Sequence, residues 1–198
     1  LGLKPVPVPA LPRADGGFGA MDPEALARAA TVQGVRGVFL MPNMQNPTTH
    51  TMSLAERQDL VKVARQADLR IVEDDPYTPF LPEILPPFGA LAPERTASIA
   101  SISKVCSPGS RIGFVHVPEA FGDSIRNKIG ESTWMASPIT AELIAGWVRE
   151  GHLFKTLRLK RKANRTRFLK AGDLLGPHFL QGPVNKVFGW LRLPDSVD

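Results

Sequence analysis

The stretch SISKVCSPGSRIGF, residues 101–114, lies near the middle of this 198-residue chain and points to its fold class. The alternating run over 99–103 is typical of a strand, yet a lysine, Lys104, follows it directly. Pro108-Gly109 then predicts a turn, and Arg111 stands just before a second strand-like run. A strand with only a structural role needs neither cation, so this stretch predicts a functional site.

Strand and helix patterns alternate along the rest of the chain. The predicted strands are residues 37–42, 69–75, 99–103, 112–117 and a final run over 183–194. The predicted helices begin at Asp22-Pro23 (ending near Ala30), after a capping box of Ser53 and Glu56, at Ser137-Pro138, and at 151 (ending near 174). This alternation predicts an α/β fold, a mostly parallel sheet with flanking helices, in which ligands bind beyond the carboxyl ends of the strands.

The composition is that of an ordinary globular protein, with 43% hydrophobic and 22% charged residues. No apolar run approaches the length of a membrane span, so we expect no membrane association and a cytoplasmic location.

The single cysteine, Cys106, cannot form an internal disulfide, and its interpretation as a nucleophile lacks a paired histidine. The four histidines are too far apart in the sequence for a metal-ligand pattern. Glycines at 16–20 follow no strand, so they predict a turn rather than a phosphate-binding loop.

The net charge of +5 is concentrated in residues 151–170, which contain four lysines, four arginines and no acid. Such a segment can bind nucleic acid, or it can be the solvated face of a helix. Apolar residues at helical spacing run through the same segment, and no aromatic residues alternate with the charges as they would in a stacking platform. The pattern therefore favours the solvated helix.

Three predicted strand ends carry polar residues. Asn46-Pro47-Thr48 follows the first strand, Asp74-Asp75-Pro76-Tyr77 ends the second, and Ser101-x-Ser103-Lys104 ends the third. If these strands are neighbours in a parallel sheet, the three groups converge on one crevice. A lysine can form a Schiff base there, a carboxylate can pair with a protonated ring nitrogen, and serines with an arginine can bind a phosphate. These are the requirements of pyridoxal 5'-phosphate (PLP).

The same motifs resemble those of fold type I PLP-dependent transferases of the class I/II aminotransferase group. NPTT (46–49) is similar to their Asn-Pro-Thr-Gly motif, EDDPY (73–77) to their Asp-x-x-Tyr motif, and SISKVCSPGSRIG (101–113) to their lysine motif. The wider sequence, through WMASPITAEL (134–143) to WLRLP (190–194), resembles the MocR-type members of the GntR family of transcription regulators. In those regulators an aminotransferase-like domain follows a DNA-binding winged helix.

The resemblance implies a role for each matching residue. Lys104 would be the catalytic residue, holding PLP as a Schiff base and shuttling protons. Asp74 would pair with the pyridine nitrogen, and Tyr77 with Asn46 would hydrogen-bond the ring oxygen; Asp75 is the alternative to Asp74. The remaining cofactor-binding residues would contact the phosphate, and these are Ser101, Ser103 and Arg111.

The resemblance also predicts the organisation of the chain. Residues 1–150 would be part of the PLP-binding large domain, and 151–198 a connecting helix and the start of a small C-terminal α+β domain. It further implies a cis Asn46–Pro47 peptide bond, while Thr49 stands where the family usually has glycine.

Neither end of the chain resembles a natural terminus, so we expect a piece of a longer protein. The glycine-containing phosphate loop, the aromatic that stacks on the cofactor ring and the winged helix would precede Leu1, and the arginine that grips a substrate carboxylate would follow residue 198. We therefore expect the chain alone to bind PLP poorly and to be inactive.

Two functions share these residues. One is the effector domain of a MocR-type regulator that senses an amino acid or amine by Schiff-base exchange at Lys104, forms homodimers, and contacts DNA only through the winged helix. The other is a free-standing aminotransferase that transfers amino groups between amino acids and 2-oxo acids. A cofactor-free scaffold is a third possibility, and it predicts no Lys104-dependent absorbance with PLP. The regulator-like sequence from residue 134 onwards favours the first.

Overall fold

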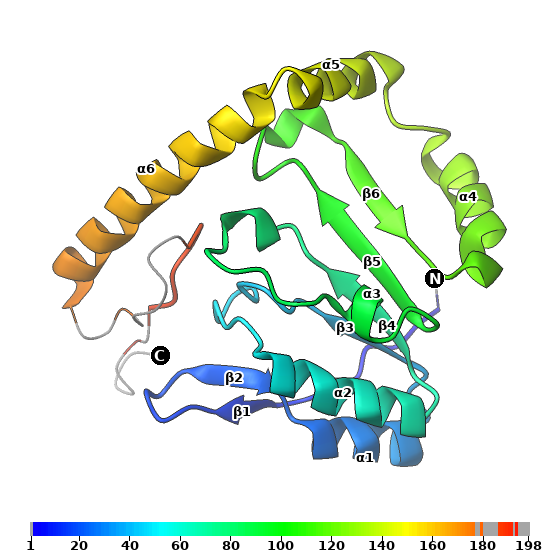
Figure 1. Ribbon diagram of the computed structural model, residues 1–198. Helices are drawn as coiled ribbons and strands as arrows, with labels where there is room; N and C mark the ends of the chain where they lie inside the picture. Colours follow the sequence, from blue (N-terminus) through cyan, green and yellow to red (C-terminus); the bar gives the residue numbers. More distant parts are fainter. Residues whose placement is uncertain (1, 177–178, 180–185, 192, 194–198) are drawn as a thin grey trace.

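The computed structural model describes residues 2–176, 179, 186–191 and 193. Its centre is a four-stranded sheet in the order β3-β4-β5-β6 (Figure 1). β3 (Gly37–Leu40), β4 (Arg70–Asp74) and β5 (Thr96–Ser101) are parallel neighbours, whereas β6 (Gly113–His116) runs antiparallel to β5. The predicted α/β fold with a mostly parallel sheet is therefore confirmed.

The helices of the first half begin where the sequence predicts them. α1 (Pro23–Gln33) is capped by the Asp22 carboxylate, which accepts from two backbone amides. α2 (Leu54–Gln66) begins with the predicted reciprocal capping box between Ser53 and Glu56. A short α3 (Phe88–Leu91) precedes β5.

The main core lies between these helices and the sheet. Leu26 and Leu60 are each 1% exposed, and they belong to one buried apolar cluster with Leu40 of β3 and Ile71 of β4. α1 and α2 lie side by side below the sheet in Figure 1. Burial of their apolar faces holds the three parallel strands in one plane, and so places the loops that follow them.

A hairpin before α1 corrects the prediction for residues 16–20. β1 (Ala10–Pro12) pairs antiparallel with β2 (Phe18–Met21), and the turn between them is closed by a hydrogen bond from the Arg13 amide to the Gly17 carbonyl (3.0 Å). Gly16 has φ +75°, which glycine adopts without strain. The first two glycines therefore form the predicted turn, but the residues after them form a strand.

The second half is helical: α4 (Glu119–Thr133), α5 (Pro138–Arg149) and α6 (His152–Leu175) follow β6 (Figure 1). α5 and α6 were predicted, whereas α4 was not, because no capping side chain marks its start at Pro118. No helix in the described part of the chain is long and apolar enough to cross a membrane. Of the strand predicted over 183–194, the described part shows one isolated bridge, between Leu191 and Phe179. The rest of that prediction lies outside the described residues.

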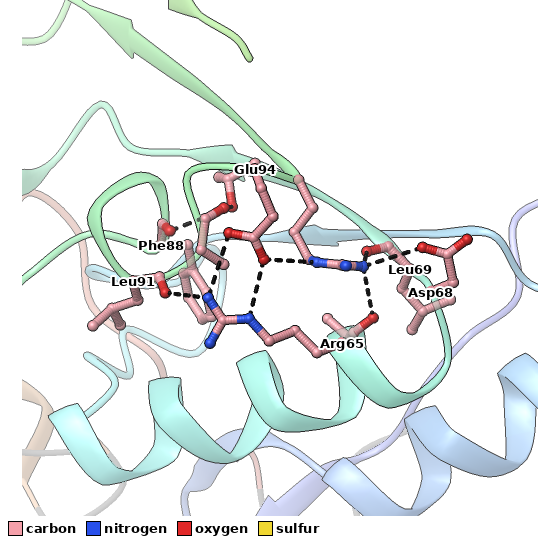
Figure 2. A network of polar contacts seen from close by, with 10 residues as sticks. Arg65, Asp68, Leu69, Phe88, Leu91 and Glu94 are labelled. Carbon is pink, nitrogen blue, oxygen red and sulfur yellow. Dashed lines mark hydrogen bonds and ion pairs between the residues drawn. The ribbon is translucent and has the colours of Figure 1, made fainter. Parts of the chain in front are cut away.

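An ion-pair network ties α2 to the segment between α3 and β5 (Figure 2). Arg65 of α2 donates to Glu94 (Nε–Oε1 3.0 Å) and to the Leu91 carbonyl (2.9 Å), and Arg95 also donates to Glu94 (3.1 Å). The hydrogen bond from Arg65 is the main reason that the pKa of Glu94 falls from 4.5 to about 2.

The lowered pKa predicts a pH-dependent effect of Glu94→Gln. The carboxylate stabilises the fold fully above its unfolded pKa of 4.5, and this stabilisation is lost as the pH falls from there towards 2. Because Glu94 and Arg65 are about half exposed, we expect a loss of at most about 1 kcal/mol at pH 7, shrinking towards zero near pH 2. Urea unfolding at several pH values measures this loss in the full-length protein to which the chain belongs. Glu83→Gln, at an exposed glutamate, is the control. A difference between Glu94→Gln and the wild type that does not change with pH would contradict the assignment.

Candidate functional site

The carboxyl ends of β3, β4 and β5 meet at one edge of the sheet because the strands are parallel and adjacent. Leu40 is in register with Glu73, and Asp74 with Ile99. The predicted site residues lie in the last positions of β4 and β5 and in the loops that follow the strands at this edge. The expectation that the three polar segments share one edge is therefore met.

The adjacent carboxylates Asp74 and Asp75 have different surroundings. Asp75 accepts hydrogen bonds from the Asn43 side chain (3.0 Å), from the Thr78 amide (3.0 Å) and from the Thr78 hydroxyl. Asp74 is half-buried, and its carboxylate makes no hydrogen bond to any described residue. Burial raises the pKa of Asp74, Asp75 raises it further, and Lys104 opposes the shift. Asp74 is therefore the acceptor that a ligand can use, whereas Asp75 holds its own loop together.

Tyr77 lies near both Asp74 and Lys104. Its side chain is 5% exposed, and the ammonium nitrogen of Lys104 lies 5.9 Å from the centre of its ring. Burial, followed by the charge of Asp74, raises the pKa of Tyr77, so its hydroxyl stays protonated and can donate at neutral pH. The geometry thus brings together a carboxylate, a phenol and an amine.

The strand that precedes Lys104 ends earlier than predicted. β5 ends at Ser101, and residues 102–106 form one helical turn, closed by a hydrogen bond from the Cys106 amide to the Ile102 carbonyl (2.8 Å). Lys104 therefore projects from a turn, exposed to solvent, rather than from the last position of a strand.

The two serines of the lysine motif contact each other. The Ser101 hydroxyl lies 3.1 Å from the Ser103 hydroxyl and accepts from the Ser103 amide at 3.1 Å. Arg111 follows the short 3-10 helix η2 (Pro108–Ser110) with φ +49° and is exposed. Its guanidinium makes no hydrogen bond within the described residues, so the structure brings the serines together but does not join Arg111 to them.

The turn after β3 contains Asn46, which is exposed and makes no side-chain hydrogen bond to a described residue. The Asn46–Pro47 peptide bond is cis, as the resemblance implies. Thr49 has φ +65°, a conformation that suits glycine and strains a β-branched residue. The position where the family usually has glycine therefore keeps the backbone conformation that glycine favours. Met44 of this turn packs with Tyr77 in a second apolar cluster, which connects the turn to the rest of the edge.

Two cations of the basic segment were not recognised as site residues. Lys160 of α6 donates to the carbonyls of Lys104 (2.9 Å) and Cys106 (2.8 Å), and Arg161 donates to the carbonyl of Pro79 (2.9 Å). The basic side chains that remain exposed fit the predicted solvated face, and these are Lys155, Arg158, Lys162, Arg165, Arg167 and Lys170. The run of charge was visible in the sequence, but nothing marked which two members turn towards the loops.

The groups at this edge fit pyridoxal phosphate. Lys104 offers an amine for its aldehyde, Asp74 an unused carboxylate for its ring nitrogen, and Tyr77 a protonated hydroxyl for its ring oxygen. The serine hydroxyls and Arg111 offer donors for its phosphate. An α/β sheet with a lysine, a carboxylate and a tyrosine at its carboxyl edge matches the arrangement that the resemblance to PLP-dependent transferases predicts.

Comparison with known proteins defines the family more closely. Residues 1–185 match the family aminotransferase class I and II, and the chain belongs to that family. Pyridoxal phosphate is the cofactor of this family. Among curated relatives, the uncharacterized HTH-type transcriptional regulator YdeF of Bacillus subtilis is 29% identical over 185 residues, which cover 89% of this chain and 38% of the relative. The resemblance to regulators is thus confirmed alongside the resemblance to aminotransferases.

Two solved aminotransferases have the same fold. The kynurenine aminotransferase of Pyrococcus horikoshii, in complex with PMP, superposes with a TM-score of 0.77 at 26% identity, over 90% of this chain and 48% of that one. The α-aminoadipate aminotransferase LysN of Thermus thermophilus has a TM-score of 0.75 at 27% identity, with the same coverage of both chains. The chain spans less than half the length of each of these three proteins.

Proposed function

We propose that this chain is the middle part of the PLP-binding effector domain of a MocR-type, GntR-family transcription regulator, which senses an amino acid or amine at Lys104. The observation that carries the proposal is the unused carboxylate of Asp74, which lies with Tyr77 and Lys104 at the carboxyl edge of the sheet. Similarity to HTH-type regulators supports the regulatory function.

Each side chain of the site then has a role. Bound pyridoxal phosphate supplies an aldehyde that reacts with amines and a protonated ring that withdraws electrons from them. Lys104 would hold the cofactor at its aldehyde carbon through Nζ, and the same amine would carry a proton to or from the amine ligand. Asp74 keeps the ring nitrogen protonated because a carboxylate favours a cation beside it. The hydroxyl of Tyr77 and the amide of Asn46 donate to the ring oxygen. The phosphate binds to the hydroxyl and guanidinium donors of Ser101, Ser103 and Arg111.

The proposal extends to the organisation of the whole protein. Residues 1–150 form part of the large domain, and residues 151–198 form the connecting helix and the start of the small C-terminal domain. The longer protein is a cytoplasmic homodimer with a small amino acid or amine as its ligand, and it contacts DNA through a winged helix outside this chain. The coverage of the relatives supports the existence of further segments.

A free-standing aminotransferase is the second candidate, and it is favoured by the similarity to solved aminotransferases at 26% and 27% identity. The two functions share every site residue in this chain. The gene region upstream of the codon for Leu1 separates them, because a winged helix and linker there identify the regulator.

Exchanging each of the two carboxylates for its amide tests the site. We expect Asp74→Asn to weaken PLP binding by about tenfold or more, through the loss of one charged hydrogen bond, and to leave unfolding unchanged. We expect Asp75→Asn to lower the free energy of unfolding by about 1–3 kcal/mol, because its three hydrogen bonds hold the loop. Spectroscopic PLP titration and urea unfolding of the natural protein measure the two effects. The reverse pattern would identify Asp75 as the cofactor's partner and contradict the assignment.

A further inference from the structure

Lys160 approaches the turn of Lys104 from a helix 56 positions further along the chain. The turn over 102–106 is closed by one backbone hydrogen bond, so the carbonyls at its end have no partner within it. The Lys160 ammonium donates to two of them, the carbonyl of Lys104 at 2.9 Å and that of Cys106 at 2.8 Å. A cation at the carbonyl end of a helical turn is favoured by the turn's dipole, and hydrogen bonds to a charged donor are stronger than neutral ones.

The neighbouring cation holds the other loop of the site. Arg161 donates from Nε to the Pro79 carbonyl (2.9 Å) and from its guanidinium to the Leu81 carbonyl (3.3 Å), just after Tyr77. On the same face of α6, Leu153 and Leu157 pack against the apolar cluster that contains Tyr77 and Val105. One face of α6, with residues at 153, 157, 160 and 161, thus contacts both the Lys104 turn and the Tyr77 loop.

We infer that Lys160 is a positioning residue, which fixes the backbone of Lys104 so that its amine faces the cofactor site, while Arg161 anchors the same helix to the loop of Tyr77. The inference rests on the proposed function, because positioning Lys104 matters only if Lys104 reacts with the cofactor. Lys104 is exposed and follows the strand by three residues, so the sheet alone does not hold it in place. The two charged hydrogen bonds from Lys160 supply that restraint.

The test compares four variants of the natural full-length protein: Lys160→Met, Lys160→Arg, Arg161→Met and, as matched control, Lys162→Met, whose lysine is exposed on the same helix. The first readout is amide hydrogen exchange of the cofactor-free protein. We expect Lys160→Met to speed exchange in residues 102–107 by about tenfold or more, because it removes two charged hydrogen bonds, and to leave α2 unchanged. Arg161→Met should act on residues 77–81 instead.

The second readout is the rate at which Lys104 becomes attached to added pyridoxal phosphate, measured by borohydride trapping. We expect Lys160→Met to slow attachment by about tenfold, and Lys160→Arg to stay close to the wild type because arginine also donates to two carbonyls. The inference is overturned if Lys160→Met behaves like Lys162→Met in both readouts, or if exchange rises and attachment keeps its wild-type rate. A wild type with no label at Lys104 would instead overturn the proposed function, and faster exchange in Lys160→Met would still show that Lys160 holds the turn.

Discussion

Lys104→Ala is expected to abolish the covalent attachment of pyridoxal phosphate in the natural protein and to weaken its binding by at least about a hundredfold, or about 3 kcal/mol. Lys104 is the amine that lies beside Tyr77 and Asp74, whereas the amine of Lys160, also near this edge, is engaged by two backbone carbonyls. Absorbance during PLP titration measures the loss.

Lys155→Ala is the matched control, since this lysine is exposed on the outer face of α6. It should bind the cofactor like the wild type. Unchanged absorbance in Lys104→Ala would assign the attachment to another lysine and remove the basis of the proposed site.

Arg57→Leu is expected to give the largest loss of stability, about 3–5 kcal/mol, the range for removing one partner of a buried charged network. Arg57 is 0% exposed, and it donates to the Met52 carbonyl (3.2 Å), the Pro86 carbonyl (3.0 Å) and the Asn43 side chain (2.6 Å). Leucine would leave these acceptors buried without a donor, and Glu73 and Asp75 would lose a nearby positive charge.

The control for that loss is Arg65→Leu, which removes a half-exposed arginine from the same helix. We expect it to lower the free energy of unfolding far less than Arg57→Leu does, because solvent screens its ion pair. Urea unfolding of both variants in the natural protein measures the difference. Equal losses would show that burial of Arg57 does not determine its contribution.

The existence of the strands was predictable because each strand follows from a local pattern, whereas their order in the sheet could be stated only as a condition. The strand-like runs before Asp74 and before Lys104 predict two strands, and the parallel sheet brings their ends together. The capping signals at Asp22 and Ser53 predicted helix starts for the same local reason. The sequence left open whether Asp74 or Asp75 is free to bind a cofactor, because the two acids are adjacent at the end of one predicted strand. Asp75 is engaged by hydrogen bonds from Asn43 and Thr78, which depend on how the loops fold.

Other features depend on contacts between distant segments and left no pattern in the sequence. Lys160 is one of the eight cations in residues 151–170, and only the packing of α6 directs it towards Lys104. Lys104 was expected at the strand end because the serine alternation continues beyond the last paired residue, Ser101. α4 was missed although Phe121, Ile125 and Ile129 stand at helical spacing, because no capping side chain marks its start at Pro118. The hairpin before α1 consists of strands of three and four residues, too short for a periodic signal.

The central claim is that Lys104 is the residue that bonds to pyridoxal phosphate, and peptide mapping after borohydride reduction tests it most directly. The natural protein is equilibrated with PLP, reduced, digested and analysed by mass spectrometry. We predict that the reduced cofactor is found on the peptide that contains Lys104, and that an excess of a reactive amine during equilibration prevents the labelling. Labelling at Lys160 instead, or no labelling of the full-length protein, would contradict the assignment.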